Sequence, residues 1–186
     1  MTVRGGLRLI AVAAVAGIVA ACSSAPAPPC PGVSILGDAS EIRLFAAGRG
    51  QDLTDVAYRA SIERVAGGCD YSRAGDSVTN TVAARLVATR GPAAQGNEGS
   101  FVFFVAVVDK EENILARERF ESTFTFDANQ RQAAAIEEIE QIIPIRADLR
   151  GIDYEILVGF ELTPEQLEFN RQERQRRTGL PRLPGR

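Results

Sequence analysis

The most informative segment of the chain is FVFFVAVV at residues 101–108, eight apolar residues in a row. It is too short to cross a bilayer as a helix, which takes about 20 apolar residues. A run of this length is typical of a central strand that is covered on both faces of a sheet. Near the end of the chain, residues 154–162 read YEILVGFEL and place an apolar side chain at every second position. That alternation predicts a strand with one buried face.

Three more segments follow the period of two that is typical of half-buried strands. Their apolar residues of one parity are Val56, Tyr58, Ala60 and Ile62; then Val78, Val82, Ala84 and Leu86; then Ile114, Ala116, Phe120, Phe124 and Phe126. The pair Gly67-Gly68 predicts the end of the first of these strands. We expect the nine Phe and three Tyr residues to pack in the core and not to line a ligand site.

Two segments are ambiguous. Residues 40–45, SEIRLF, fit either a short helical turn or a strand. Residues 133–143 place Ile136, Ile139 and Ile143 three or four positions apart, which favours a short amphipathic helix that ends before Pro144. A strand of a sandwich would also accommodate this segment.

Five predicted strands joined by hairpin-like loops, without alternating helices, indicate an antiparallel sandwich or barrel. We predict a mainly β protein, with an antiparallel β-sandwich over residues 31–162. An immunoglobulin-like sandwich is one form that the pattern allows, although the chain has no tryptophan, the usual core residue of that fold.

The end of the chain predicts a helix. Thr163-Pro164-Glu165-Gln166 forms a T-x-x-Q capping box with proline at the first helical position. The helix should run from Pro164 to about Arg177, within a C-terminal segment of residues 163–186. We expect it to dock through Leu167 and Phe169 and to project its arginine-rich end away from the domain.

The composition excludes much of classical enzymology. The chain has 186 residues and no histidine, and Lys110 is its one lysine. Without histidine there is no Ser/His or Cys/His pair and no histidine-containing zinc site. One lysine leaves almost no room for Schiff-base or P-loop chemistry. We therefore predict a protein that is not an enzyme and has no cofactor and no metal.

The N-terminus carries the most specific pattern. Arg4 and Arg8 precede an uncharged apolar run, residues 9–21, which has the length of a signal-peptide core. The run ends in Val19-Ala20-Ala21-Cys22, which resembles the lipobox of bacterial lipoproteins. The resemblance implies that residues 1–21 are removed and that Cys22 receives a diacylglycerol and an acyl chain such as palmitate. The alternative is a plain secretory signal that happens to precede a cysteine.

The segment after Cys22 fits a lipid anchor. Residues 23–29 read SSAPAPP, which predicts a semi-extended tether, so we assign residues 22–30 to the lipidated N-terminus and its tether. Serine at position 23 resembles the outer-membrane sorting pattern of lipoproteins from two-membrane bacteria. The resemblance implies a protein in the outer membrane that faces the periplasm, with the inner membrane as the alternative.

Two cysteines remain if Cys22 carries lipid, and export would place them in an oxidising compartment. Cys30 and Cys69 then form the one available intramolecular disulfide, which would close a loop of about 40 residues. Two buried free thiols are the alternative. The bond would connect the start of the domain to a later strand.

Charge is unevenly distributed. The whole chain carries −3, while residues 171–186 hold six arginines and one acid. Because the signal segment adds +2 and this tail +5, the residues between them carry −10. A solvated tail is one interpretation. The other is a contact surface for an anionic lipid, an envelope polymer or an acidic partner protein. The candidate contact residues are Arg171, Arg174, Arg176 and Arg177.

Three functions fit these patterns. The first is a lipid-anchored envelope protein with a non-enzymatic interaction or assembly domain, a protein partner and no contact with nucleic acid. The second is a periplasmic module that binds a small molecule or lipid near the loop at residues 91–99. The third is a hydrolase that uses paired carboxylates. No acidic position stands out, so the first hypothesis is preferred.

Overall fold

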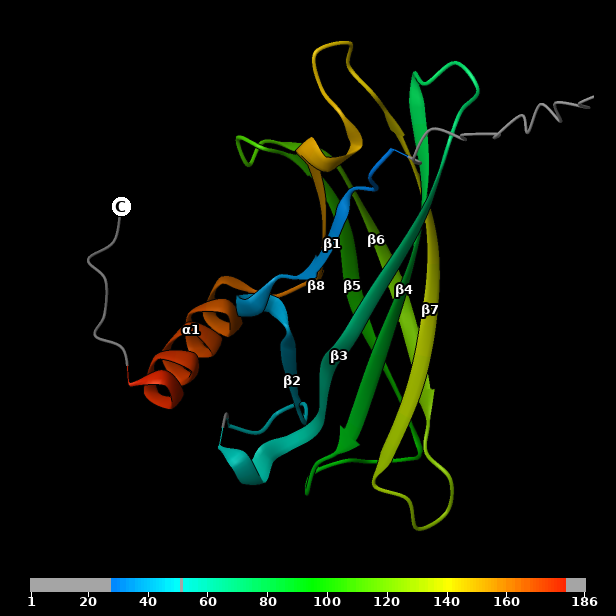
Figure 1. Ribbon diagram of the computed structural model, residues 1–186. Helices are drawn as coiled ribbons and strands as arrows, with labels where there is room; N and C mark the ends of the chain where they lie inside the picture. The colour runs from blue at the N-terminus through cyan, green and yellow to red at the C-terminus, as the bar shows by residue number, and fades with distance from the viewer. Residues whose placement is uncertain (1–27, 51, 180–186) are drawn as a thin grey trace, which may run out of the picture.

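The computed structural model describes residues 28–50 and 52–179, which form two sheets and one long helix (Figure 1). The strands are β1 (Gly32–Ile35), β2 (Glu41–Phe45), β3 (Val56–Tyr71), β4 (Ser77–Arg90), β5 (Glu98–Asp109), β6 (Ile114–Thr125), β7 (Gln132–Pro144) and β8 (Tyr154–Phe160). The helix α1 (Pro164–Thr178) follows the last strand, and short 3-10 turns η1 (Gly37–Ala39), η2 (Leu53–Asp55) and η3 (Gly151–Asp153) join other elements.

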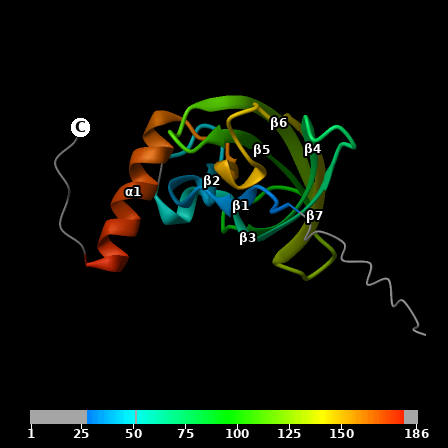
Figure 2. The same cartoon turned by 45° about the horizontal axis from the view of Figure 1, so that its top comes forward.

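The sheets have the orders β1-β8-β5-β6 and β2-β3-β4-β7. All neighbouring strands are antiparallel except β1 and β8, which pair in parallel. The strands surround a common interior when the molecule is tilted (Figure 2). The predicted mainly β, sandwich-like fold with a C-terminal helix is confirmed. Constant-type immunoglobulin sheets have the orders A-B-E-D and C-F-G, so the sandwich alone is what the strand order here supports.

The core lies between the sheets and is rich in phenylalanine. Phe103, Phe124, Phe126 and Phe160 are among the largest fully buried side chains. The rings of Phe101 and Phe124 meet edge to face, with centroids 5.6 Å apart. These aromatic residues fill the interior as expected, whereas Phe169, which is 42% exposed, does not pack in the core.

Strand β5 is covered on both faces, as its composition predicts. Phe103 and its alternate neighbours point into the main core, whereas Phe104 and Ala106 lie in a second, smaller cluster with Ala39 of η1 and Leu162. The turn η1 and the segment before α1 thus cover part of the outer face of this sheet.

Strand β7 corrects the prediction of a short helix at residues 133–143. It pairs with β4 along its whole length, from Gln132 opposite Thr89 to Pro144 opposite Ser77. Ile139 and Ile143 face the core, while Ile136 is 66% exposed. The spacing of the isoleucines was misleading because the long neighbour β4 supplies hydrogen-bond partners that a local pattern does not reveal.

Strand β3 is also longer than expected, because it continues through Gly67-Gly68 to Tyr71. A Cβ atom at Gly67 would collide with the Val33 side chain of β1. This glycine therefore permits the close approach of β1 and does not end the strand. The ambiguous residues 40–45 contain strand β2, at the edge of the second sheet.

Candidate functional site

The helix α1 begins as the sequence predicts. The Thr163 side chain accepts a hydrogen bond from the backbone N–H of Gln166 at 3.3 Å, and the Gln166 side chain accepts one from the backbone N–H of Thr163 at 2.9 Å. Pro164 lies at the first helical position. At the other end, Gly179 adopts a left-handed conformation with φ of 64° and donates to the Gln175 carbonyl. The expected helix is confirmed and extends one residue further, to Thr178.

The docking of α1 is polar, whereas we expected apolar docking through Leu167 and Phe169. No residue of the helix is buried; Leu167 is half-buried and Phe169 is 42% exposed. The Asn170 side chain donates to the carbonyl oxygens of Asp38 and Glu41, at 3.0 and 2.7 Å. Gln166 donates in the same way to the Arg43 carbonyl at 3.1 Å. Two amides, one helical turn apart, thus pair with carbonyls of η1 and of the edge strand β2.

The arginines of α1 do not project from the domain as expected. Arg171 and Arg174 both pair with Asp38 in η1, and Arg177 pairs with Glu41 of β2 at 3.3 Å. Arg176 instead contacts Glu173 of its own helix at 2.7 Å and is 71% exposed. The structure therefore brings three of the four candidate arginines together against the domain and leaves Arg176 on the solvent side.

Arg43 completes this cluster and is its most buried member. Its side chain is 11% exposed and lies 3.7 Å from Glu41, which also pairs with Arg177. Its guanidinium lies over the Phe169 ring, 4.7 Å from the centroid. Among the described residues, its Nη1 atom is buried without a hydrogen-bond partner. Burial lowers the pKa of Arg43 from its ordinary value, and the nearby Glu41 opposes that shift.

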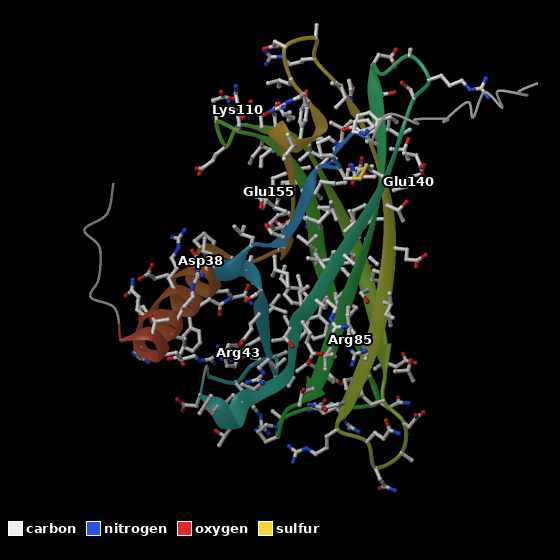
Figure 3. All side chains as sticks on the ribbon, in the orientation of Figure 1. Asp38, Arg43, Arg85, Lys110, Glu140 and Glu155 are labelled. Atoms are coloured by element: carbon white, nitrogen blue, oxygen red, sulfur yellow. A yellow bond between two sulfur atoms is a disulfide. The ribbon has the colours of Figure 1, made fainter. Side chains whose placement is uncertain are left out.

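Two adjoining cavities flank Arg43 between α1 and β2. The larger, about 380 Å³, is lined by the apolar residues Ile42, Phe45 and Phe169 and by Thr163, Glu165 and Gln166. The smaller, about 80 Å³, is lined mainly by polar residues, among them Glu41, Glu173, Arg174 and Arg177. Arg43 and Asn170 line both. We call this pair of cavities the helix groove. Figure 3 shows Asp38 and Arg43 on the side of the molecule where α1 lies, and Arg85 on strand β4 away from the helix.

A shallow hollow also lies at the loop where the sequence predicted a ligand. It is lined by residues of the segments 90–94 and 129–131 and is more open than the helix groove. It contains Gly91 and Pro92 but little apolar wall. The prediction of a ligand at residues 91–99 remains untested.

The disulfide is present as predicted. Cys30 is bonded to Cys69 of β3, with 5.7 Å between the Cα atoms. Beside it, the Tyr71 hydroxyl donates to the Pro29 carbonyl at 2.6 Å. A Cβ atom at Gly151 would collide with both of these groups. The start of the domain is therefore fixed to β3 and to η3. Cys22, the predicted lipidation site, lies outside the described residues.

Sequence reasoning missed Asp38, Glu41 and Arg43. They lie in or beside the segment that was ambiguous between turn and strand, so no face could be assigned to them. One available signal was the spacing of Arg171, Arg174 and Arg177, which recur every three residues and therefore share one face of a helix. That spacing indicates a common partner surface, although it does not identify the surface.

Within residues 28–50 and 52–179, no group of three or more His, Cys, Asp or Glu side chains could hold a metal ion. No helix in this part of the chain combines the length and the apolar character needed to span a membrane. Comparison with models of protein families, with curated proteins and with solved structures gives no match for this chain.

Proposed function

We propose that the protein is a lipid-anchored envelope protein whose sandwich is a non-enzymatic interaction domain facing the periplasm, with the outer membrane as its location. The observation that carries the proposal is the fixed start of the domain. Pro29 and Cys30 are held by Tyr71 and Cys69 only a few residues after the lipobox. Seven residues from Cys22 to Pro29 span at most about 25 Å, so a lipid on Cys22 would keep this end of the sandwich near the bilayer.

Replacing the acyl acceptor tests the anchor. The variant Cys22→Ala should leave the membrane fraction, or accumulate as an unprocessed precursor, because no acyl chain can be attached. The matched control Ser24→Ala keeps the acceptor and should fractionate like the parent protein. Mature Cys22→Ala protein that remains with membranes as before would rule out the anchor.

The arginine-rich half of α1 is the proposed contact for an envelope partner protein: Arg176 lies on the solvent side, and Arg174 and Arg177 pair with Asp38 and Glu41 of the domain. Arg174, Arg176 and Arg177 keep half or more of their side-chain surface exposed. Arginine makes bidentate contacts with carboxylates that lysine does not reproduce. Changing all three to Gln should reduce in vivo crosslinking to the partner, and added salt should reproduce that loss. The control Arg85→Gln alters an exposed arginine of β4 that pairs with Glu63 of β3 and not with α1. Equal crosslinking by the triple variant and the parent would exclude α1 as the contact.

A second candidate function, a module for a small molecule or lipid, is favoured by the helix groove. Ligand cavities commonly enclose about 300–1,000 Å³ and combine apolar walls with a few polar groups. The larger cavity, about 380 Å³ with Arg43 at one side, has both properties.

A further inference from the structure

We propose that the helix groove binds a small amphipathic anion, with its apolar chain between Phe45 and Phe169 and its anionic head at Arg43. This inference deepens the ligand-binding candidate function and does not depend on the lipid anchor.

The first argument is the charge balance around the groove. Arg171 and Arg174 share the carboxylate of Asp38, and Arg43 and Arg177 share that of Glu41. Arg176 pairs with Glu173, which lines the smaller cavity, and Glu165 lines the larger one. These five arginines and four acids together leave a net charge of +1. A positive charge next to a cavity attracts an anion, and a cavity with low-dielectric walls strengthens the attraction.

The second argument is the state of Arg43. A buried charge is costly unless it is paired and hydrogen-bonded. Arg43 has the Glu41 carboxylate at 3.7 Å, the Phe169 ring over its guanidinium, and a buried Nη1 without an acceptor among the described residues. A carboxylate or phosphate oxygen in the groove would supply that acceptor. The exposed Phe169 ring covers the guanidinium, so its rotation would open the way for such a head group.

The third argument is the shape of the groove, which fixes the direction of the ligand. Arg43 lies where the polar and the apolar cavity meet. The apolar cavity is lined by Ile42, Phe45 and Phe169, and Glu165 also lines it. The Glu165 carboxylate would repel an anionic head beside it. The head therefore belongs at Arg43 and the chain in the apolar cavity.

Such a ligand can be a free organic acid or an anionic lipid at a membrane surface. Both present the same chemistry, a negative head on an apolar chain. The experiment below therefore uses octanoate below its micelle concentration for the first source. Vesicles of phosphatidylcholine, with and without phosphatidylglycerol, represent the second.

The test uses the full chain with Cys22→Ala, because acyl chains on the protein would compete with the ligand. The chain has no tryptophan, so Phe169→Trp introduces a single fluorophore in the groove while keeping an aromatic ring. Calorimetry on the chain without this reporter provides a second readout. Octanoate should bind, octyltrimethylammonium should bind at least about tenfold more weakly, and acetate, which lacks the chain, should not bind.

Variants of Arg43 then test whether this residue binds the anionic head group. Arg43→Gln should weaken octanoate binding about tenfold or more and remove the preference for the anion, whereas Arg43→Lys should retain that preference. The matched control Arg85→Gln removes an exposed arginine of β4 and should bind like the parent. Circular dichroism checks that each variant is folded.

Binding of octanoate that depends on Arg43 supports a free acid as ligand. Cosedimentation only with phosphatidylglycerol vesicles, again dependent on Arg43, supports a lipid in the bilayer. Equal affinity for the anion and the cation, no loss in Arg43→Gln, or no binding to either source would overturn the inference. Fractionation of Cys22→Ala reports separately on the anchor.

Discussion

The sandwich and the helix α1 are held by different interactions. The sandwich buries a continuous apolar core, in which Phe103, Val78 and Ile156 are 1% exposed or less. The helix has no buried residue and is fastened to the domain by two side-chain amides and by ion pairs. Apolar burial contributes about 25 cal/mol per Å², while an exposed ion pair contributes about 0–1 kcal/mol. The helix should therefore open locally at a lower free energy than the sandwich.

The largest expected effect is in the core. Phe103→Ala should lower the free energy of unfolding by about 3–5 kcal/mol, because it removes a buried ring that stacks near Phe120 and leaves a cavity. Urea unfolding followed by circular dichroism measures this change. Leu115→Ala, at a position that is 48% exposed, is the control and should stay within about 0.5 kcal/mol. Similar values for the two variants would contradict the description of the core.

Loss of the disulfide should have the second-largest effect on the free energy of unfolding. Replacing Cys30 and Cys69 together with serine should cost about 2–5 kcal/mol, because the unfolded chain regains the freedom of the closed loop. Chemical unfolding of the oxidised protein and of the double variant gives the difference. The parent protein unfolded under reducing conditions should match the variant, and a loss confined to the variant would point to the serines and not to the bond.

Replacement of a buried polar pair inside the sandwich should raise the stability of the protein, in contrast to the two changes above. Asn80 and Gln141 lie opposite each other on β4 and β7, both buried, with amide atoms that have no partner among the described residues. Asn80→Leu with Gln141→Met removes these groups at similar volume and should stabilise the sandwich by about 1–3 kcal/mol. The melting temperature measures the effect. A fall in melting temperature would indicate that both amides are satisfied, for example by buried water.

Loss of the helix cap should affect α1 alone. Thr163→Ala should cost about 1 kcal/mol because it removes an acceptor for the Gln166 backbone N–H. Hydrogen exchange should quicken in α1, while the amides of β4 keep their protection. Asn170→Ala, which releases the carbonyls of Asp38 and Glu41, should produce the same local pattern. Equal loosening of β4 would mean that helix and sandwich open together.

The smallest expected effect is on the stability of the protein at acidic pH. The Asp109 carboxylate accepts hydrogen bonds from the Asn113 side chain and backbone and from the Glu111 backbone, and these hold its pKa below the ordinary value. A lowered pKa in the folded state gives stability that is present above the unfolded pKa, about 3.9, and is lost as the pH falls through the folded pKa. Asp109→Asn should therefore flatten the acid side of the curve of melting temperature against pH. Asp127→Asn serves as the control, and parallel curves for Asp109→Asn and the parent would exclude this contribution.

The sequence predicted the structure correctly in strands whose alternate side chains face the core. The alternation at Val78, Val82 and Leu86 predicts a strand because each inward position is apolar, and all three are fully buried. The cap at Thr163 was equally readable because its partners are three residues apart. The docking of α1 could not be predicted from the sequence. The Asn170 side chain donates to carbonyls about 130 residues earlier, and any backbone carbonyl could accept such a hydrogen bond. Arg43 could not be identified because its segment, residues 40–45, was ambiguous between a turn and a strand.

The bond between Cys30 and Cys69 also determines how the domain would carry a mechanical load from a lipid anchor. Without the bond, tension on the N-terminal tether would pull first on β1, a strand of four residues that pairs at the edge of its sheet. Such a strand can be peeled away one hydrogen bond at a time. With the bond, tension enters β3, a strand of 16 residues, at Cys69, which lies opposite Asn80 in the long β3–β4 ladder. The covalent link thus passes the force around the four-residue strand and into this ladder.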